Sequence, residues 1–290
     1  REGIRYYKGE HYILDYRLLY FDSDGQVQED KFRSNIKIPH QFHTELVDQK
    51  VQYLLSNPVE INTEDEILEK YLEEYINEDF QAMLQDLLEG ASNKGVEYVY
   101  AYMDREGKLN FQVADSLKVI PIYDDTTYEL EKIIYYYDDE IIVNGEKKQV
   151  TRAQVWTEKD VTYYIYIEGK KDYELDDKYK PNPRPHITLE DEDAIYDGGN
   201  LGYIPFFVLE NNKYKKTDLE PIKRIIDDYD LMACSLSNNL QDFQDAIYVV
   251  KGYPGDNLDE LVTNLKTRKT IGVDADGGID VKTIDIPYEA

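Results

Sequence analysis

One long amphipathic helix constrains this chain more than any other feature of its sequence. The run Thr217-Asp218-Leu219-Glu220 has the pattern of a capping box, and Pro221 follows in the first turn, where proline is tolerated. From there apolar side chains recur on one face at the spacing of an α-helix. We therefore predict a helix over residues 217–246 with one apolar stripe, which consists of Ile222, Ile225, Ile226, Tyr229, Met232, Leu236, Leu240, Phe243 and Ile247.

The opposite side of this helix is polar and carries Asp227, Asn238, Asp242 and Asp245. An apolar stripe has to be covered, and a long helix with one narrow stripe usually packs on other helices. The sequence predicts no second long helix downstream. We therefore expect the stripe's partner to be a neighbouring subunit or a further part of the protein.

The first 212 or so residues have the pattern of helices followed by a mostly antiparallel sheet. Residues 40–56 carry apolar side chains at helical spacing, and Thr63-Glu64-Asp65-Glu66 has the pattern of a capping box before two further helices. Near Gly95 the spacing becomes alternating, which predicts strands and an α+β fold. The predicted strands are residues 96–103, 109–113, 119–123, 132–137, 153–157, 161–168 and 203–208, with a proline-rich loop over 178–200.

Residues 247–290 have the pattern of a small βαββ unit. A strand over 247–251 precedes a helix over 258–267, and residues 270–273 and 279–284 form a hairpin about Asp276-Gly277-Gly278. A unit of about forty residues buries too little apolar surface to be stable alone. We therefore expect this unit to need a partner.

Composition limits the kinds of function open to the chain. Its 60 acidic residues against 33 basic ones give a net charge of −27, whereas gripping duplex DNA by its phosphates needs clustered Lys and Arg. The single cysteine, Cys234, excludes an internal disulfide and is expected to be a small buried residue of the helix. The 28 tyrosines favour strands and half-buried surfaces. No run has the length of a transmembrane helix.

The short motifs that carry chemistry in other proteins are incomplete here. Asp22-Ser23-Asp24-Gly25 and Asp274-Ala275-Asp276-Gly277 resemble the start of a calcium loop, but their glycine comes too early, so we expect hairpin turns. His40 and His43 have a spacing used in zinc sites, without a third ligand. We predict no catalytic residues, no metal and no cofactor. Two short basic groups are expected at solvated helix ends. The first is Lys213, Lys215 and Lys216, and the second is Lys266, Arg268 and Lys269. For the second group, contacts with phosphate or with a partner are the alternative.

Five runs, taken in order, resemble one protein family. They are residues 46–58 (LVDQKVQYLLSNP), 119–125 (VIPIYDD), 202–206 (GYIPF), 218–223 (DLEPIK) and 238–248 (NNLQDFQDAIY). Together they span nearly the whole chain and are similar to the portal proteins of tailed phages, of the type found in siphophages of Gram-positive hosts. None of the runs is a catalytic signature, so the resemblance rests on the ordered set.

The resemblance implies a ring, normally a dodecamer, at one vertex of the capsid. Double-stranded DNA would pass through its axial tunnel without sequence-specific binding, and terminase, the head-tail adaptor, scaffolding and capsid proteins would be partners. It also implies assembly in the host cytoplasm, a place in the virion and no membrane. Residues 1–212 would be the wing domain, 213–246 the stem helix and 247–290 the clip domain. The second stem helix, tunnel loop, wing helix and crown of the family are expected to be absent from this chain.

A mechanism without catalysis follows from the resemblance and the charge. A tunnel lined by carboxylates binds duplex DNA weakly, so the DNA slides past it. Asp227, Asn238, Asp242 and Asp245 are the candidates for the tunnel or inter-stem face, with a solvated outer face as the alternative. Two other functional classes remain open: an acidic hydrolase with a perturbed carboxylate pair, and a Tyr-rich module that binds carbohydrate or protein. Both leave the stripe and the last unit unexplained.

Overall fold

The computed structural model of this chain describes residues 1–21, 24–30, 33–104, 107–143, 145–191, 194–242, 247–251 and 278–282. The chain divides into two compact units. The first consists of residues 1–11 and 40–226, and the second of residues 12–39 and 227–290. Residues 12–39, predicted as part of the first domain, therefore lie in the second unit with most of the long helix.

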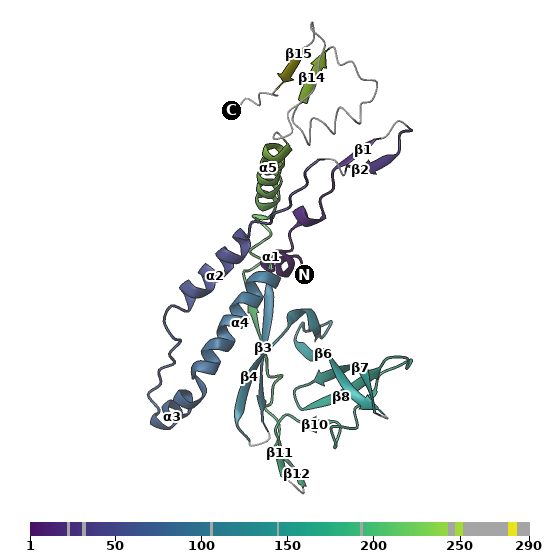
Figure 1. Cartoon of the computed structure of the whole chain (residues 1–290). Helices are drawn as coiled ribbons and strands as arrows, with labels where there is room; N and C mark the ends of the chain where they lie inside the picture. The colour runs from purple at the N-terminus through teal and green to yellow at the C-terminus, as the bar shows by residue number, and fades with distance from the viewer. Residues whose placement is uncertain are drawn as a thin grey trace. The chain divides into compact units, whose positions relative to one another are not determined.

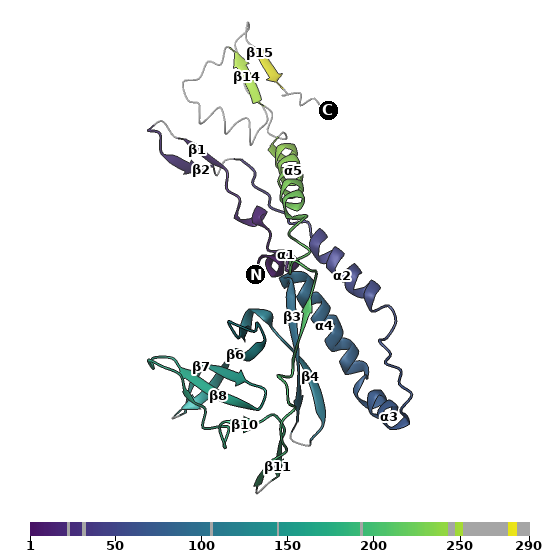
Figure 2. The same cartoon turned by 180° about the vertical axis from the view of Figure 1, so that it is seen from behind.

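The first unit has the predicted α+β class, because its helices precede antiparallel strands (Figure 1). Helix α2 lies within the predicted helix 40–56, and α3 and α4 are the two helices predicted after it. Seen from behind in Figure 2, α2 and α4 run side by side, and they are in contact. The helices of this unit are α1 (Glu2–Tyr7), α2 (Phe42–Leu54), α3 (Glu66–Tyr75) and α4 (Glu78–Lys94).

The start of α3 differs from the predicted capping box. The Asp65 carboxylate accepts hydrogen bonds from the backbone N–H groups of Ile67 and Leu68 at 2.9 and 3.2 Å, so Asp65 and not Thr63 is the N-cap. The Thr63 hydroxyl instead accepts from the Asp65 N–H at 3.2 Å. Asp caps a helix as well as Thr does, so the two residues compete for this position.

Helix α4 packs on a three-stranded antiparallel sheet. It ends at Gly95, whose φ of 85° lies in the left-handed region that glycine adopts without strain. A Cβ at Gly95 would also lie 2.1 Å from the carbonyl oxygen of Lys215, so this position fits glycine alone. The sheet has the order β13-β3-β4, with strands β3 (Val96–Met103), β4 (Leu109–Ala114) and β13 (Phe206–Glu210).

A second antiparallel sheet has the order β10-β8-β7-β6-β5, with β9 paired to β8. Part of the predicted loop over 178–200 belongs to it, since β10 pairs with β8, and β11 and β12 form a separate hairpin. Prolines and acids obscure the alternation there, and Pro185 lies on an edge strand, where its missing N–H is tolerated. After the short helix η2 (Ser116–Lys118) the strands are β5 (Val119–Tyr123), β6 (Leu130–Val143), β7 (Glu146–Trp156), β8 (Asp160–Ile167), β9 (Glu174–Leu175), β10 (Arg184–Pro185), β11 (Thr188–Asp191) and β12 (Ala194–Asp197).

The largest buried core of the first unit joins the two sheets through aromatic rings. Phe206 of β13 stacks on Tyr100 of β3 with centroids 5.0 Å apart and meets Trp156 of β7 at 5.4 Å. Ile133 of β6 and Val161 of β8 are buried in the same cluster. Burying large aromatic surfaces of this kind is a main source of stability, and it fixes the sheets to each other.

The long helix is α5 (Lys223–Asp242), and its residues from 227 onward belong to the second unit. This unit also contains the short 3-10 helix η1 (Tyr12–Asp15) and two pairs of strands. Strands β1 (Leu19–Phe21) and β2 (Val27–Glu29) form one antiparallel pair, in which Leu19 lies opposite Glu29 and Phe21 opposite Val27. Strand β14 (Ile247–Lys251) matches a predicted strand, and it pairs antiparallel with β15 (Gly278–Lys282). The predicted helix over 258–267 and strand over 270–273 lie outside the described residues.

Candidate functional site

Helix α5 begins later than the sequence predicts. The Thr217 hydroxyl accepts a hydrogen bond from the Glu220 N–H at 3.3 Å, which is half of a capping box. The Glu220 carboxylate does not complete it, because it accepts from the Lys216 ammonium at 2.5 Å. Residues 217–222 therefore form tight turns, and regular helix starts at Lys223, whose N–H donates to the Leu219 carbonyl at 2.8 Å.

A polar cluster of four side chains holds the turn that leads into α5. The Lys50 ammonium on α2 donates to Asp218 at 2.7 Å, to Asn211 at 2.5 Å and to the Ser92 hydroxyl at 2.9 Å. Asn211 also donates to the second carboxylate oxygen of Asp218 at 2.8 Å. We call Lys50, Ser92, Asn211 and Asp218 the junction cluster, since they connect α2, α4 and β13 to the start of the helix.

Electrostatics favours the charged form of Asp218 in this cluster. Burial alone acts to raise the pKa of the Asp218 carboxyl, but the hydrogen bonds from Lys50 and Asn211 and the charge of Lys50 outweigh it and lower the pKa. The Asp218 N–H also donates to the Ser92 carbonyl at 3.0 Å. Side-chain and backbone contacts therefore fix the same turn. The sequence contains one signal for this cluster, since Lys50 is the only Lys or Arg on α2 and needs an anionic partner.

A buried histidine lies close to the junction cluster in the first unit. His43 on α2 is fully buried, and its Nε2 lies 2.9 Å from the side-chain oxygen of Asn93 on α4. Burial lowers the pKa of His43, with the hydrogen bond to Asn93 acting against it. The neutral ring therefore acts as a packing and hydrogen-bonding group that joins α2 to α4, which agrees with the absence of a zinc ligand set among the described residues.

Only part of the predicted apolar stripe is covered in this chain. Ile226 is 3% exposed and packs with Tyr6, Leu219 and half-buried Ile222 in the first unit. Ile247, predicted as the last member, belongs to strand β14 and not to the helix. The other five members on α5 lie on a different face of the helix and are exposed. We call them the exposed stripe; they are Ile225 (68%), Tyr229 (43%), Met232 (59%), Leu236 (47%) and Leu240 (53%). Phe243 lies outside the described residues.

The buried face of α5 within the second unit is the one on which we predicted a polar surface. Asp230 and Cys234 are 0% and 3% exposed, and Asn238 lies one turn further along. The Asn238 side-chain oxygen accepts from the Ile36 N–H at 2.6 Å, so its amide is engaged by this chain's own backbone. Asp227 is half-buried, and Asp242 is the last residue of α5. Asp245, Lys266, Arg268 and Lys269 lie outside the described residues.

The reason for this difference is a covering segment that is distant in the sequence. Asn238 lies opposite Leu236, as the sequence indicates, but Ile36 of residues 34–39 binds the Asn238 side chain. Since this segment is irregular and 202 positions away, its contacts with α5 could not be predicted from the sequence. The residues proposed for the tunnel or inter-stem face therefore stay predictions, and Asn238 also has a structural role.

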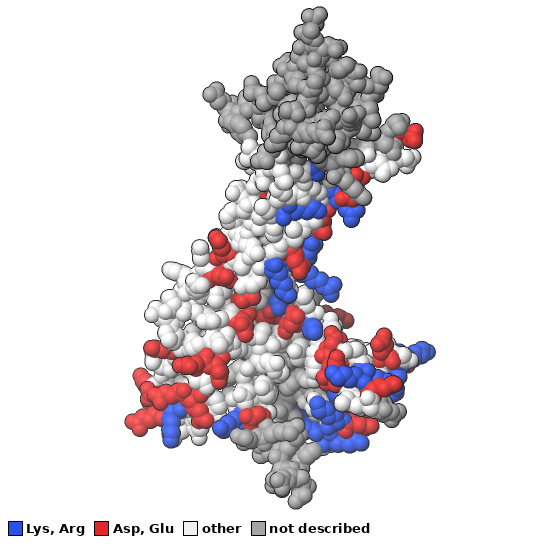
Figure 3. Space-filling model, in the orientation of Figure 1, with Lys and Arg blue, Asp and Glu red and all other residues white. Residues whose placement is uncertain are grey.

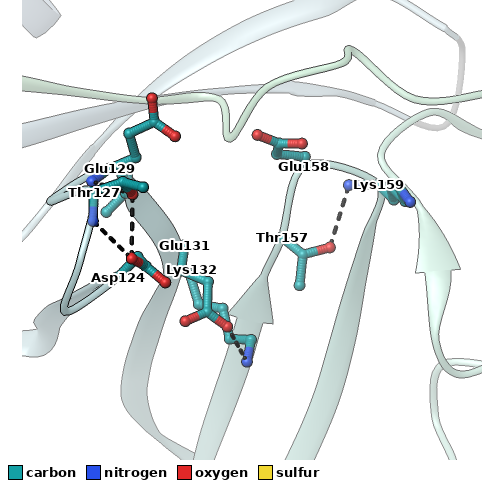
Figure 4. A pocket seen from close by; sticks show the side chains of 9 residues that line it. Asp124, Thr127, Glu129, Glu131, Lys132, Thr157, Glu158 and Lys159 are labelled. Atoms are coloured by element: carbon teal, nitrogen blue, oxygen red, sulfur yellow. Dashed lines mark hydrogen bonds and ion pairs between the residues drawn. The ribbon is translucent and has the colours of Figure 1, made fainter.

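The first unit also has an open pocket of about 490 Å³ lined by acidic side chains, namely Asp124, Glu129, Glu131 and Glu158, beside Lys132 and Lys159 (Figure 4). The Asp124 carboxylate accepts from the backbone N–H groups of Thr126 and Thr127 at 2.8 Å each, and those bonds lower its pKa. Glu131 pairs with Lys132 at 2.7 Å. Asp124 thus caps a turn and Glu131 pairs with a cation, so neither has the environment of a catalytic acid in a hydrolase.

Surface charge is unevenly distributed over the first unit. In Figure 3 acidic side chains gather over α3 and its neighbourhood, and basic and acidic side chains alternate over the second sheet. Among the described residues, no three His, Cys, Asp or Glu side chains are placed to hold a metal ion. None of the described helices is long and apolar enough to cross a lipid bilayer.

Comparison with known proteins finds the same similarity along the whole chain. A family model described as "Phage portal protein, SPP1 Gp6-like" matches residues 1–290. The portal protein of Bacillus phage SPP1 is 34% identical over 291 residues, which cover 100% of this chain and 56% of that protein. The portal protein of Clostridium phage phiCD119 is 30% identical over 279 residues, covering 88% of this chain and 56% of that protein. The chain thus spans about half the length of these relatives.

Proposed function

Because this chain belongs to the SPP1 Gp6-like family of phage portal proteins, we propose that it is the part of a portal subunit that forms a DNA-conducting ring at a capsid vertex. The family is structural, so the chain is not an enzyme, as the sequence predicted. In this proposal residues 1–212 act as the wing, residues 213–246 as the stem helix and residues 247–290 as the clip. A dodecamer is the proposed ring size.

The exposed stripe of α5 carries this proposal. Five large apolar side chains, each at least 43% exposed, follow one another along one face of the helix. Monomeric soluble proteins rarely leave such a continuous apolar surface uncovered, whereas a subunit of a ring covers it with a neighbour. Their separations of four, three, four and four residues suit a helical partner. We propose that the stripe packs on the stem helices of the assembled ring.

The charge of the chain supports a tunnel through which DNA slides. With a net charge of −27, the chain offers few sites at which phosphates are held, and a carboxylate surface repels them. We propose that Asp227, Asp242 and Asp245 line the tunnel or the inter-stem face, and that Asn238 contributes there only where its contact with Ile36 allows. DNA would then pass without sequence-specific binding.

The proposed partners are those of a portal subunit. Terminase and the head-tail adaptor would meet the clip, where Lys266, Arg268 and Lys269 are candidate contacts, and scaffolding and capsid proteins would meet the outer surface of the ring. The proposed place of the protein is the portal vertex of the virion, after assembly in the host cytoplasm. The observation that supports a partner-dependent clip is its small size, since about forty residues bury too little apolar surface alone.

The tunnel proposal is tested by reversing its charge in a portal protein of full length. Asp227→Lys together with Asp242→Lys is expected to slow DNA packaging or ejection, because lysines hold phosphates that would otherwise slide past. Asp125→Lys, an exposed residue of the first unit, is the charge-matched control and should leave DNA transport unchanged. Unchanged transport in the double variant, with rings still formed, would count against the proposed tunnel face.

A further inference from the structure

A short irregular segment lies along the buried face of α5 in the second unit. We call residues 34–39 the strap. The Ile36 N–H donates to the Asn238 side-chain oxygen at 2.6 Å, and the Asn238 amide donates back to the Ile36 carbonyl at 3.4 Å. Two residues on, the Ile38 N–H lies 3.2 Å from the Cys234 sulfur, whose thiol donates to the Ile38 carbonyl at 3.6 Å. Alternate strap residues thus bind α5 one helical turn apart.

The strap is less deeply buried than the face of α5 that it covers. Every strap residue is half-buried or exposed, and the Ile38 side chain is 48% exposed. A small pocket of about 90 Å³ remains between the strap and α5, lined by Ile36 and Leu231 among others. Cys234, which also lines this pocket, is 3% exposed. A segment with few buried apolar contacts opens more easily than a packed core.

The strap also connects α5 to a second exposed surface, the apolar face of the β1–β2 hairpin. It follows the β1–β2 hairpin directly in sequence, and the hairpin stands away from α5 in both Figure 1 and Figure 2. The register places Leu19, Phe21 and Val27 on one face of the hairpin, where they are 60%, 75% and 56% exposed. A two-stranded hairpin is marginally stable in water by itself, so its position depends on the segment that anchors it.

We propose that the strap is a releasable latch. In the closed state it covers Cys234 and anchors the hairpin to α5 through Asn238. In the open state the strap leaves α5 while the helix and the first unit stay folded, so the buried face of α5 is exposed and the hairpin is free to move. Opening breaks the two bonds at Asn238 and the two contacts of the Cys234 thiol, among the contacts that hold the strap.

The use of this latch rests on the proposed portal function, but the latch itself does not. A portal subunit has to bury the exposed stripe and the apolar hairpin face when neighbours arrive. A latch that opens locally lets both surfaces adjust to a neighbour without unfolding the subunit. The test described next uses neither DNA nor a ring, so its failure would leave the proposed function unaffected.

Thiol labelling measures latch opening directly, because Cys234 is the single cysteine of the chain. We expect a disulfide reagent to modify Cys234 in the folded chain at least tenfold faster than global unfolding allows, with a weak dependence on denaturant. Asn238→Ala should raise that rate about tenfold, since it removes both bonds to Ile36. The faster labelling should keep its weak dependence on denaturant, and the equilibrium constant of global unfolding should rise by no more than the same factor. Gln241→Ala, at an exposed amide side chain on α5 that does not line this pocket, is the matched control and should leave the rate as it is.

Hydrogen exchange on the unaltered chain covers the case in which the Asn238 variant fails to fold. The amides of Ile36 and Ile38 should exchange together, well before the amides in the middle of α5. The latch is overturned if Cys234 reacts only at the rate of global unfolding. It is also overturned if the α5 amides exchange together with those of the strap, because the helix itself would then be opening.

Discussion

The Lys50 ammonium on α2 lies 2.7 Å from the Asp218 carboxylate, although 168 positions separate the two residues in the sequence. Asp218 belongs to the turn that leads into α5, and Lys50 also binds Ser92 and Asn211. One cation therefore connects α2, the end of α4 and the end of β13 to the start of the long helix.

Removal of the Lys50 charge should loosen that turn. Lys50→Met keeps the length of the side chain and removes three hydrogen bonds, which leaves a half-buried carboxylate without its cation. We expect the free energy of unfolding to fall by about 1–3 kcal/mol, measured by denaturant titration of the chain. Lys70→Met, an exposed lysine on α3, is the control and should change stability by less than about 0.5 kcal/mol. Equal effects of the two variants would contradict a structural role for Lys50.

The contribution of Asp218 should depend on pH in a defined direction. Its pKa is lowered in the folded chain, so its contribution is complete above the ordinary pKa of 3.8 and is lost as the pH falls through the lower folded value. The difference in unfolding free energy between the natural chain and Asp218→Asn should therefore be constant near neutrality and shrink as the pH falls below about 4. A difference that stays constant down to pH 3, or grows there, would contradict this assignment.

The two faces of α5 should respond differently to substitution. Ile226→Ala removes a buried side chain from the cluster with Tyr6 and Leu219, and should cost about 2–5 kcal/mol of folding free energy. Leu236→Lys replaces a 47% exposed side chain of the exposed stripe, and should change the stability of this chain by less than about 0.5 kcal/mol. In a portal protein of full length, Leu236→Lys should instead prevent ring assembly, which light scattering would show. Rings formed normally by that variant would contradict the role of the stripe.

Lys94 and Glu97 form a buried ion pair near the end of α4, and replacing the lysine should cost more stability than replacing the glutamate. Lys94 contacts the Glu97 carboxylate, which is 1% exposed, and lies 2.9 Å from Asp115. Burial raises the pKa of Glu97, with Lys94 acting against it, so the charge of Glu97 depends on that cation. Lys94→Met should cost about 3–5 kcal/mol at neutral pH because it leaves a buried carboxylate alone.

Glu97→Gln is the matched variant, because it removes the buried negative charge and leaves Lys94 with Asp115. Its cost should be smaller than that of Lys94→Met, and thermal unfolding of the two variants side by side would measure the difference. The Glu97 carboxylate also accepts from the Ser116 N–H at 2.7 Å, a bond that the amide oxygen of Gln can keep. A larger loss for Glu97→Gln would contradict the assignment of Lys94 as the compensating charge.

Much of the fold is predictable from the sequence where the apolar period is strong. Helix α2 and strands β3, β5 and β8 lie close to their predicted bounds, because their apolar side chains repeat at a regular spacing. On α2, however, Phe42, Leu46 and Leu54 of the predicted apolar face are 40–52% exposed. The exact start of a helix is harder to predict, because hydrogen bonds of the turn before it and of neighbouring side chains determine it. The cap of α3 is Asp65 because two good capping residues compete there, and α5 begins at Lys223 because Glu220 binds Lys216 instead of completing the box.

The candidate site shows the same limit. The exposed stripe could be predicted, since Met232, Leu236 and Leu240 repeat at helical spacing. The engagement of Asn238 by Ile36 could not, because an irregular segment 202 positions away covers that face. The junction cluster joins residues from three distant parts of the chain. Its only signal in the sequence is Lys50, the one Lys or Arg on α2.

The measurement that tests the portal assignment most directly is the mass and shape of the protein in solution, with this 290-residue chain beside a version extended to the length of its relatives. Light scattering and negative-stain imaging would report both. We expect closed rings from the extended protein, and loss of those rings with Leu236→Lys. A strict monomer in both forms would contradict the assignment of this chain to a DNA-conducting ring.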